Sequence, residues 1–167
     1  MTVYTTLASP IGELLLVGEA SAGAPGGTAL VSLSVPGQKG GAVVQDDWVE
    51  DAAAFGEIAG QLTAYFAGER TSFDIEYAAS GTEFRRRVWD ALDAIPYGET
   101  LSYGEIAARI GASRAAVRAV GTAIGANPLL VVRPCHRVIG ADGSLTGYAG
   151  GLERKERLLV HEGALSS

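Results

Sequence analysis

Two helices joined by a tight turn place the strongest constraint on the fold of this chain. Residues 102–105, Ser-Tyr-Gly-Glu, form a capping box, in which a serine and a glutamate exchange hydrogen bonds with the backbone to open a helix. That helix is expected to run to Ile110, and Gly111 then makes the turn. Ser113 is expected to cap a second helix that continues to about Ala126. This is a helix-turn-helix pattern, which also occurs in helical cores that bind nothing.

Further capped helices flank this pair, so the second half of the chain is expected to be mainly helical. Thr82 is a candidate N-cap for a helix whose apolar residues recur at helical spacing, and Pro96 lies just beyond its end. A C-terminal amphipathic helix is expected to begin after Gly151 and to end at Gly163.

The first half has the pattern of a small α+β unit with glycine-rich loops. Alternating apolar residues predict strands, and apolar residues at helical spacing predict one helix. The expected segments are a hairpin of residues 3–7 and 13–19, a strand at 28–35, a helix at 47–67 and a strand at 72–78. Nothing in this half gathers catalytic residue types. We therefore expect two domains, a structural α+β domain over residues 1–80 and a helix-turn-helix domain over residues 81–167.

Length and cysteine content limit the class of protein. The 167 residues suffice to bury a hydrophobic core, and no run of about 18 uncharged apolar residues predicts a membrane span. The N-terminal segment lacks the basic and apolar regions of a signal peptide. A single cysteine cannot form an internal disulfide, and no cysteine pair or histidine cluster predicts a metal site. We expect a soluble, cytoplasmic protein without a metal or cofactor.

Charge is distributed unevenly along the chain. Residues 1–81 carry two basic and ten acidic side chains, a net charge of −8, whereas residues 82–167 carry eleven basic and nine acidic ones, a net charge of +2. Residues 106–141 contain five arginines and no acidic residue. Such a segment suits the binding of phosphate. A solvated basic face is the alternative, and charge alone does not decide between the two.

The second helix of the helix-turn-helix has two contrasting faces. One face is expected to be buried; it consists of Ala116, Val117, Val120 and Ile124. The opposite face carries Arg114, Arg118, either Gly121 or Thr122, and Gly125, so it is cationic and nearly bare of side-chain bulk. Each glycine inside a helix costs roughly 1 kcal/mol relative to alanine, which indicates a close approach to the backbone. Either another helix packs there or nucleic acid binds there, and nucleic acid explains the arginines as well.

The only cysteine lies in the sequence Val-Val-Arg-Pro-Cys-His-Arg-Val-Ile-Gly, residues 131–140. Free cysteines are usually buried and inert, which is one interpretation of Cys135. The other is a nucleophile, because two arginines and a histidine lie within two residues and are able to lower the pKa of a thiol from about 8.5. Neighbouring side chains of a strand point to opposite faces, so His136 reaches Cys135 only if the chain turns there or through a water molecule.

A nucleophile–base pair normally needs a third group that orients the base. Glu162 lies in the last turn of the C-terminal helix, an unfavourable end for a carboxylate that a cationic partner such as His136 would offset. A solvated Glu162 is the alternative. His161 suits the negative end of the helix and is expected to stabilise it. In the glycine-rich segment 146–151, Tyr148 is either an aromatic wall of a site or part of a simple turn.

Taken together, these motifs resemble the O6-alkylguanine-DNA alkyltransferases, also called methylated-DNA–protein-cysteine methyltransferases. The resemblance covers about residues 82–163 in consistent order. It rests on "FRRRVWDALDAIPYGETLSYGEIAARIG", "AAVRAVGTAIGANP", "RPCHRVIGADGSLTGYAGGLERKERLL" and "HEG". It implies a ribonuclease-H-like fold for the N-terminal half, with looser support. It also implies direct-reversal repair, in which an alkylated guanine is flipped out of the duplex and its O6-alkyl group moves irreversibly to a cysteine.

The resemblance also implies a role for individual residues. Cys135 would be the single-use acceptor, His136 would deprotonate it through a water molecule, and Glu162 would orient His136. Tyr103 would assist flipping and donate a proton toward the departing guanine, Arg118 would fill the gap left by the flipped nucleotide, and Asn127 would brace the link between recognition helix and active-site loop. The remaining implied residues are Arg114, Ala116 and Gly121 on DNA, and Val138, Tyr148, Ala149 and Gly150 around the guanine.

The implied partner is double-stranded DNA that contains O6-alkylguanine, bound in the minor groove by a protein associated with the nucleoid during repair. We expect a monomer in solution and no membrane partner, and the sequence does not decide whether the protein assembles cooperatively on DNA. Some members of the family carry serine where Ala149 stands, and some have zinc ligands in the N-terminal half, where this chain has no cysteine. Two rivals remain: a helix-turn-helix regulator or lesion-binding protein without chemistry, and a cysteine hydrolase that uses Cys135 and His136.

Overall fold

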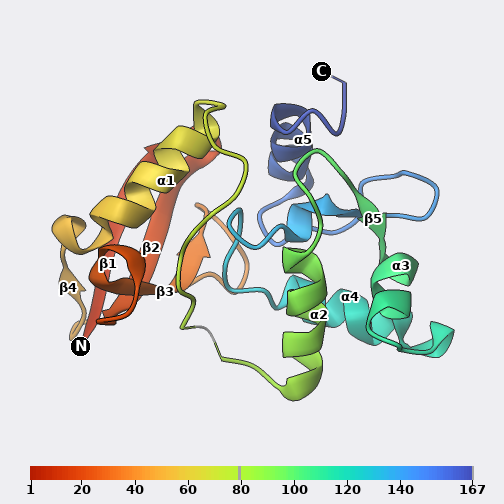
Figure 1. Ribbon diagram of the computed structural model, residues 1–167, viewed down its shortest axis with the longest axis horizontal. Coiled ribbons are helices and arrows are strands. Elements are labelled where there is room, and N and C mark those ends of the chain that lie inside the picture. Colours follow the sequence, from red (N-terminus) through yellow and green to blue (C-terminus); the bar gives the residue numbers. More distant parts are fainter. Residues whose placement is uncertain (79, 167) are drawn as a thin grey trace. The chain divides into compact units, whose positions relative to one another are not determined.

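The computed structural model describes residues 1–78 and 80–166. The chain divides into two compact units, residues 1–79 and residues 80–167. The N-terminal unit combines a sheet with one α-helix, and the C-terminal unit is mainly helical (Figure 1). The predicted fold class, an α+β unit followed by a mainly α unit with a helix-turn-helix, is confirmed. The described residues contain no helix that is long and apolar enough to cross a membrane.

A four-stranded sheet in the order β3-β2-β1-β4 forms the frame of the N-terminal unit. The predicted hairpin is present: β1 (Thr2–Ser9) and β2 (Gly12–Ala20) are antiparallel, with Ser9 opposite Gly12 at the turn. The predicted third strand is β3 (Thr28–Ser34), which pairs with β2. A short 3-10 turn, η1 (Pro25–Gly27), precedes it.

The predicted helix at 47–67 was wrong over its first nine residues. Helix α1 spans Gly56–Phe66, after the 3-10 turn η2 (Ala52–Phe55). Residues Val49–Glu50 form β4, which runs parallel to β1 and pairs with it. The Asp51 side chain then accepts a hydrogen bond from the Ala54 N–H, which starts the helical turns only after the strand has ended. Long-range pairing therefore overrides a local helical pattern in this segment.

The predicted strand at 72–78 was also wrong, apart from one bridge between Leu30 and Tyr77. A side chain takes the place of a neighbouring strand there. The Gln61 amide on α1 donates to the Asp74 carbonyl oxygen at 2.9 Å, and its oxygen accepts the Asp74 N–H at 2.8 Å. The Asp74 backbone is thus tied to the helix, while Glu76 and Ala78 exchange backbone hydrogen bonds with Leu30 at the bridge.

Four α-helices build the C-terminal unit: α2 (Glu83–Asp93), α3 (Tyr103–Arg109), α4 (Val117–Gly125) and α5 (Leu152–His161). A two-stranded parallel sheet joins β5 (Leu101–Ser102) to β6 (Val138–Ile139). The 3-10 turns are η3 (Arg114–Ala116) and η4 (Cys135–Arg137). The pair α3–α4 is the helix-turn-helix, with Gly111 at a φ of +72° in the turn.

Capping signals place most of these helices where the sequence predicts them. Thr82 accepts a hydrogen bond from the Arg85 N–H, and Ser102 and Glu105 form both bonds of the capping box. Ser113 is an exception: its backbone is extended like that of an N-cap, but its side chain caps nothing. Helix α4 instead begins through the 3-10 turn η3, three residues later than Ser113 predicts.

The core of this unit joins α2 to the second helix of the pair. The Trp89 indole N–H donates to the Ala123 carbonyl oxygen at 2.9 Å, and both residues are buried. On α4 the buried residues are Val120, Ala123 and Ile124. The predicted buried face was therefore only partly right, because Ala116 and Val117, where the 3-10 turn meets the helix, are only half-buried.

Candidate active site

The loop between α4 and η4 presents the cysteine through two three-residue turns. Val131 has a φ of +69°, and the next N–H, that of Val132, donates to the Leu130 carbonyl oxygen at 2.8 Å. Positive φ is rare for a β-branched residue and costs on the order of 1–3 kcal/mol. A second turn surrounds Pro134, where the Cys135 N–H donates to the Arg133 carbonyl oxygen at 2.7 Å. Cys135 therefore begins a 3-10 turn and lies in no strand, which removes the objection to a contact with His136.

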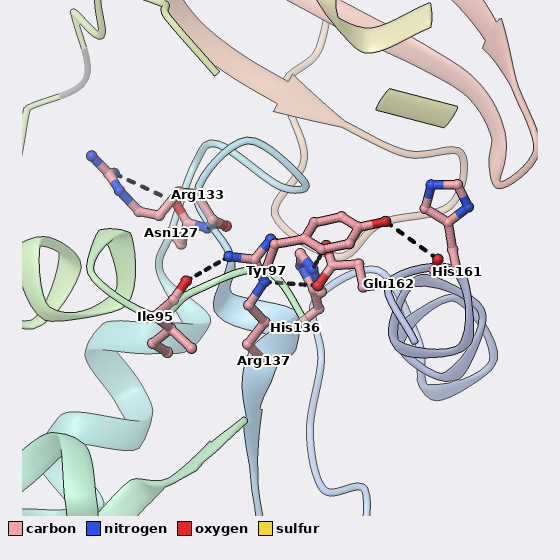
Figure 2. Close-up of polar contacts among 8 residues, drawn as sticks. All are labelled: Ile95, Tyr97, Asn127, Arg133, His136, Arg137, His161 and Glu162. Carbon is pink, nitrogen blue, oxygen red and sulfur yellow. Dashed lines mark hydrogen bonds and ion pairs between the residues drawn. The ribbon is translucent and has the colours of Figure 1, made fainter. Parts of the chain in front are cut away.

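Asn127 ties this loop to the end of α4. Its amide donates to the carbonyl oxygens of Leu129 and Arg133, each at 3.3 Å, and its oxygen accepts the Leu129 N–H at 3.0 Å. The residue is buried, so these bonds compete little with water. Figure 2 shows Asn127 beside the Arg133 guanidinium, at 3.5 Å. The side chain thus connects three points of one loop immediately before the cysteine.

A buried polar cluster lies on the other side of the cysteine. The His136 Nε2 lies 2.8 Å from one Glu162 oxygen, and the Arg137 guanidinium donates to both oxygens of that carboxylate at 2.7 and 3.0 Å (Figure 2). Arg137 also donates to the Ile95 carbonyl oxygen at 2.6 Å. Glu162 is buried at the end of α5, so the solvated alternative was wrong.

The cluster fixes which nitrogen of His136 is free to accept a proton. Burial lowers the pKa of His136, against the opposing effect of the Glu162 hydrogen bond, so the ring is neutral near pH 7. Its single proton then belongs on Nε2, where the carboxylate accepts it. Among the described residues nothing bonds to His136 Nδ1, which is buried. Nδ1 therefore carries the basic lone pair.

The arginines do not lower the pKa of the Cys135 thiol below its ordinary value, as the sequence pattern suggested. Burial raises this pKa to about 11 and outweighs the Asn127 hydrogen bond and the charges of Lys155 and Arg133. The two guanidinium groups are also engaged by carboxylates. Arg137 is bonded to Glu162, and Arg133 lies 3.4 Å from the Asp93 carboxylate.

A small cavity of about 130 Å³ opens beside the cysteine. Its volume is well below the roughly 300–1,000 Å³ of sites for drug-sized ligands, so it suits a small group. The lining residues are Tyr103, Gly121, Ile124, Gly125, Cys135, Gly147, Tyr148 and Ala149. Two predicted pocket residues, Val138 and Gly150, are not among them. Val138 is buried in β6, and Gly150 leaves the space that the Tyr148 ring fills, since a Cβ there would lie 2.7 Å from the ring.

Tyr103 bridges the helix-turn-helix and the glycine-rich loop. It is the first residue of α3, and its hydroxyl donates to the Thr146 carbonyl oxygen at 2.8 Å. Its ring lies 3.9 Å from the point where a Cβ on Gly121 would stand, which is ordinary contact. The ring therefore lies against the middle of α4, at Gly121, and forms part of the cavity wall.

The cationic face of α4 is open within the C-terminal unit. Arg114 and Arg118 are exposed, and Ala116 is half-buried at the start of the helix. Gly125 is exposed, and a Cβ built on it would meet nothing within 4 Å among the described residues. No helix of this unit packs on Gly125, so tight helix packing does not account for that glycine.

Lys155 belongs to the site but was not predicted from the sequence. Its side chain is fully buried, and its Nζ donates to the carbonyl oxygens of Thr146 at 2.9 Å and Gly147 at 3.1 Å. Spacing gives a signal for it, because Lys155 precedes the buried Leu158 and Leu159 by three and four residues and so shares their face. The role of Arg137 as partner of Glu162 was missed as well. The described residues contain no group of three or more side chains suited to a metal ion.

Family models match both halves of the chain. Residues 2–78 match the ribonuclease-like domain of 6-O-methylguanine DNA methyltransferase, and residues 83–164 match its DNA binding domain. A methylated-DNA–protein-cysteine methyltransferase of Mycolicibacterium paratuberculosis is 53% identical over 162 residues, which cover 97% of this chain and 93% of the relative. One of Methanosarcina acetivorans is 51% identical over 161 residues, covering 96% and 98%.

Solved structures agree with these matches. The Mycobacterium tuberculosis O6-methylguanine methyltransferase has a TM-score of 0.84 at 49% identity, over 98% of this chain and 94% of that one. The Mycobacterium tuberculosis OGT in complex with DNA has a TM-score of 0.84 at 50% identity, over 97% and 93%. The O6-methylguanine-DNA methyltransferase of Pyrococcus kodakaraensis, at 22% identity and a TM-score of 0.67, shares the fold.

Proposed function

Because the chain belongs to the 6-O-methylguanine DNA methyltransferase family, we propose that it repairs O6-alkylguanine in DNA by direct reversal, with Cys135 as the acceptor. One observation carries the assignment of the acceptor. The only cysteine of the chain lines a small cavity, and the next residue, His136, has a basic nitrogen that bonds to nothing among the described residues. The protein is consumed in a single turnover, because the thioether that forms is not reversed.

The first step is removal of the thiol proton. Burial keeps Cys135 protonated at rest, so a base must act when the lesion arrives. A water molecule between the two residues passes the proton from Sγ to His136 Nδ1. Glu162 accepts the Nε2 proton and stabilises the imidazolium that forms, while Arg137 holds the carboxylate in place.

The second step is an in-line displacement. The thiolate sulfur forms a bond to the alkyl carbon as the bond between that carbon and O6 of guanine breaks, and the electron pair of the broken bond remains with the guanine. The departing guanine takes a proton from the Tyr103 hydroxyl, and the proton held by His136 replaces it through solvent. The net change is a thiol converted to a thioether and an alkylated guanine converted to guanine. Tyr103 must first exchange the Thr146 carbonyl for the base as its hydrogen-bond acceptor.

The exposed face of α4 is the proposed DNA-binding surface. Arg118 fills the gap that the flipped nucleotide leaves, and Arg114 contacts phosphate. The small residues Ala116 and Gly121 allow the helix to enter the minor groove closely. The open space at Gly125 supports this assignment. Affinity is expected to fall as salt concentration rises, because arginine–phosphate contacts release counterions.

The flipped guanine occupies the cavity between Tyr148 and Cys135. Tyr148 and Ala149 form its wall, with recognition through the Ala149 backbone N–H, and Val138 and Gly150 support that wall from behind. Asn127 keeps the loop that carries Cys135 in register with α4. The proposed domains are residues 1–80 and 81–167; the protein acts as a monomer that assembles cooperatively on DNA, in the cytoplasm and at the nucleoid.

The proposal is tested by mixing the protein with an excess of duplex that contains one O6-methylguanine. Loss of one lesion per protein molecule, with restored guanine as product, is expected. Repair of many lesions per molecule, or binding that leaves the lesion intact, would contradict the proposal. Binding alone would favour a lesion-binding protein without chemistry.

A further inference from the structure

Lys155 is a buried cation without an acidic partner. It lies in the middle of α5 with a relative exposure of 0%. Its Nζ donates to two neutral carbonyl oxygens, those of Thr146 and Gly147. No carboxylate among the described residues forms an ion pair with it. Lysine is almost never fully buried unless its charge is paired, so this side chain calls for a functional explanation.

The other charges near the cysteine already have partners. Arg137 is bonded to the Glu162 carboxylate on both oxygens, and Arg133 pairs with Asp93 while its guanidinium stacks 4.9 Å from the centre of the Trp89 ring. The polar and titratable groups that act on the thiol or border it are Asn127, Arg133, His136, Tyr148 and Lys155. Of these, Lys155 is the cation without an anionic partner.

We propose that Lys155 is the counter-ion of the Cys135 thiolate, and that it positions the pocket loop for the same step through its two carbonyl contacts. The inference rests on the proposed role of Cys135 as acceptor. When the thiol proton passes to His136, two new charges appear. The imidazolium lies against Glu162, and the thiolate forms in the cavity that Gly147 also lines, whose carbonyl oxygen accepts a hydrogen bond from the Lys155 ammonium. Alkylation turns the thiolate into a neutral thioether and leaves the ammonium unpaired again.

The electrostatics of the two groups are consistent with this pairing. Burial lowers the pKa of Lys155 to about 8, and a negative Cys135 raises it. Burial raises the pKa of Cys135 to about 11, and the Lys155 charge lowers it. The coupling is reciprocal, so whatever removes one charge must shift the pKa of the other group.

Thiol reactivity tests the proposal without DNA or a lesion. The rate of alkylation of Cys135 by iodoacetamide is measured against pH in the full-length protein and in Lys155→Met and Lys155→Arg. The chain has one other lysine, the exposed Lys39, so Lys39→Met is the matched control. We expect Lys155→Met to slow the reaction about tenfold near pH 7, where Lys155 still carries its charge, which corresponds to about one unit in the pKa of the thiol. Lys39→Met is expected to match the wild type. A folded Lys155→Met with the wild-type profile would overturn the proposal.

A second measurement does not depend on the folding of a lysine variant. With two lysines in the chain, ¹⁵N-lysine NMR gives two Nζ titrations, which Lys39→Met assigns. Lys155 is expected to titrate at a higher pH in Cys135→Asp than in the wild type, because the aspartate carries a negative charge at a pH where the thiol is still protonated. Equal Lys155 pKa values in the two proteins would overturn the proposal. If both tests give the expected results but the protein does not repair O6-methylguanine, the proposed function is refuted and the pairing of Lys155 with the Cys135 thiolate still stands.

Discussion

His136 and Glu162 lie 26 residues apart in the sequence and are joined by a buried contact of 2.8 Å between Nε2 and a carboxylate oxygen. The same carboxylate binds Arg137 through both of its oxygens. The Glu162 carboxylate therefore contacts two residues of the segment that carries the cysteine, His136 and Arg137. It directs the basic lone pair of His136 onto Nδ1, and it neutralises a guanidinium that would otherwise be buried alone.

Glu162→Gln removes the charge and keeps the shape of this residue. Arg137 then stays buried without a counter-charge, which is expected to cost about 3–5 kcal/mol of unfolding free energy. Urea unfolding at neutral pH measures the loss. Glu156→Gln, at an exposed position of the same helix, is the matched control and should change stability by less than about 0.5 kcal/mol. Equal stability of the two variants would show that the Arg137 pair is not the anchor described here.

Stability is expected to fall below about pH 6.5. The pKa of His136 is lowered in the folded protein from 6.5, so the unfolded chain binds more protons as the pH falls through 6.5 and the folded state loses free energy. Unfolding free energies between pH 5 and 8 measure this slope. His136→Gln, which still donates to Glu162, should flatten the slope, and His161→Gln should retain it. A slope that persists in His136→Gln would assign the effect to another group.

Tyr103→Phe removes the hydroxyl and keeps the aromatic ring, so it distinguishes the contribution of one from that of the other. The ring contact with Gly121 remains, so the fold should be kept, while the bond to Thr146 and the proton donor are lost. We expect the single-turnover repair rate to fall by at least tenfold, because a positioned acid contributes roughly 10²–10⁴ to a rate. The iodoacetamide reactivity of Cys135 should not change. Tyr97→Phe, which removes a hydroxyl with a long 3.4 Å bond to the His161 carbonyl oxygen, is the control.

Arg118→Ala tests the proposed DNA face. The side chain is exposed, so the free energy of unfolding should stay within about 0.5 kcal/mol of the wild type. The repair rate should fall by a larger factor than the affinity for DNA, because Arg118 fills the gap in the duplex only after the nucleotide has flipped out. Arg114→Ala should instead weaken binding and lower the salt slope by about one unit. Lys39→Ala controls for the loss of a charge. Identical repair rates in Arg118→Ala and the wild type would remove that residue from base flipping.

Local signals account for the parts of the fold that the sequence predicts. The Thr82 cap and the Ser102 capping box each act within one helical turn, so three or four residues suffice to place those helices. The hairpin of β1 and β2 is likewise closed by a two-residue turn. Errors occurred where distant partners decide. The pairing of β4 with β1 replaced the start of a helix, and Gln61 replaced a neighbouring strand.

The site residues, like the helices and strands, were predicted where the signal is local and missed where a distant partner decides. Cys135 and His136 stand out in the sequence because they are adjacent, and Glu162 was a candidate from its place at the end of the C-terminal helix, to which the resemblance gave a role. The buried partners Arg137 and Lys155 did not stand out, since Arg and Lys are mostly exposed and nothing local indicates that a distant carboxylate or carbonyl awaits them. The pKa of Cys135 was misjudged for a related reason. Neighbouring arginines are visible in sequence, but the groups that engage them and the burial that opposes them are properties of the fold.

Transfer to Cys135 is tested most directly by peptide mass mapping after reaction with duplex that contains O6-methylguanine. We expect one added methyl group on the peptide that carries Cys135, in one-to-one ratio with the guanine restored. Cys135→Ala should bind the same duplex and leave the lesion intact. An unmodified Cys135 peptide after repair, or repair by Cys135→Ala, would show that Cys135 is not the acceptor.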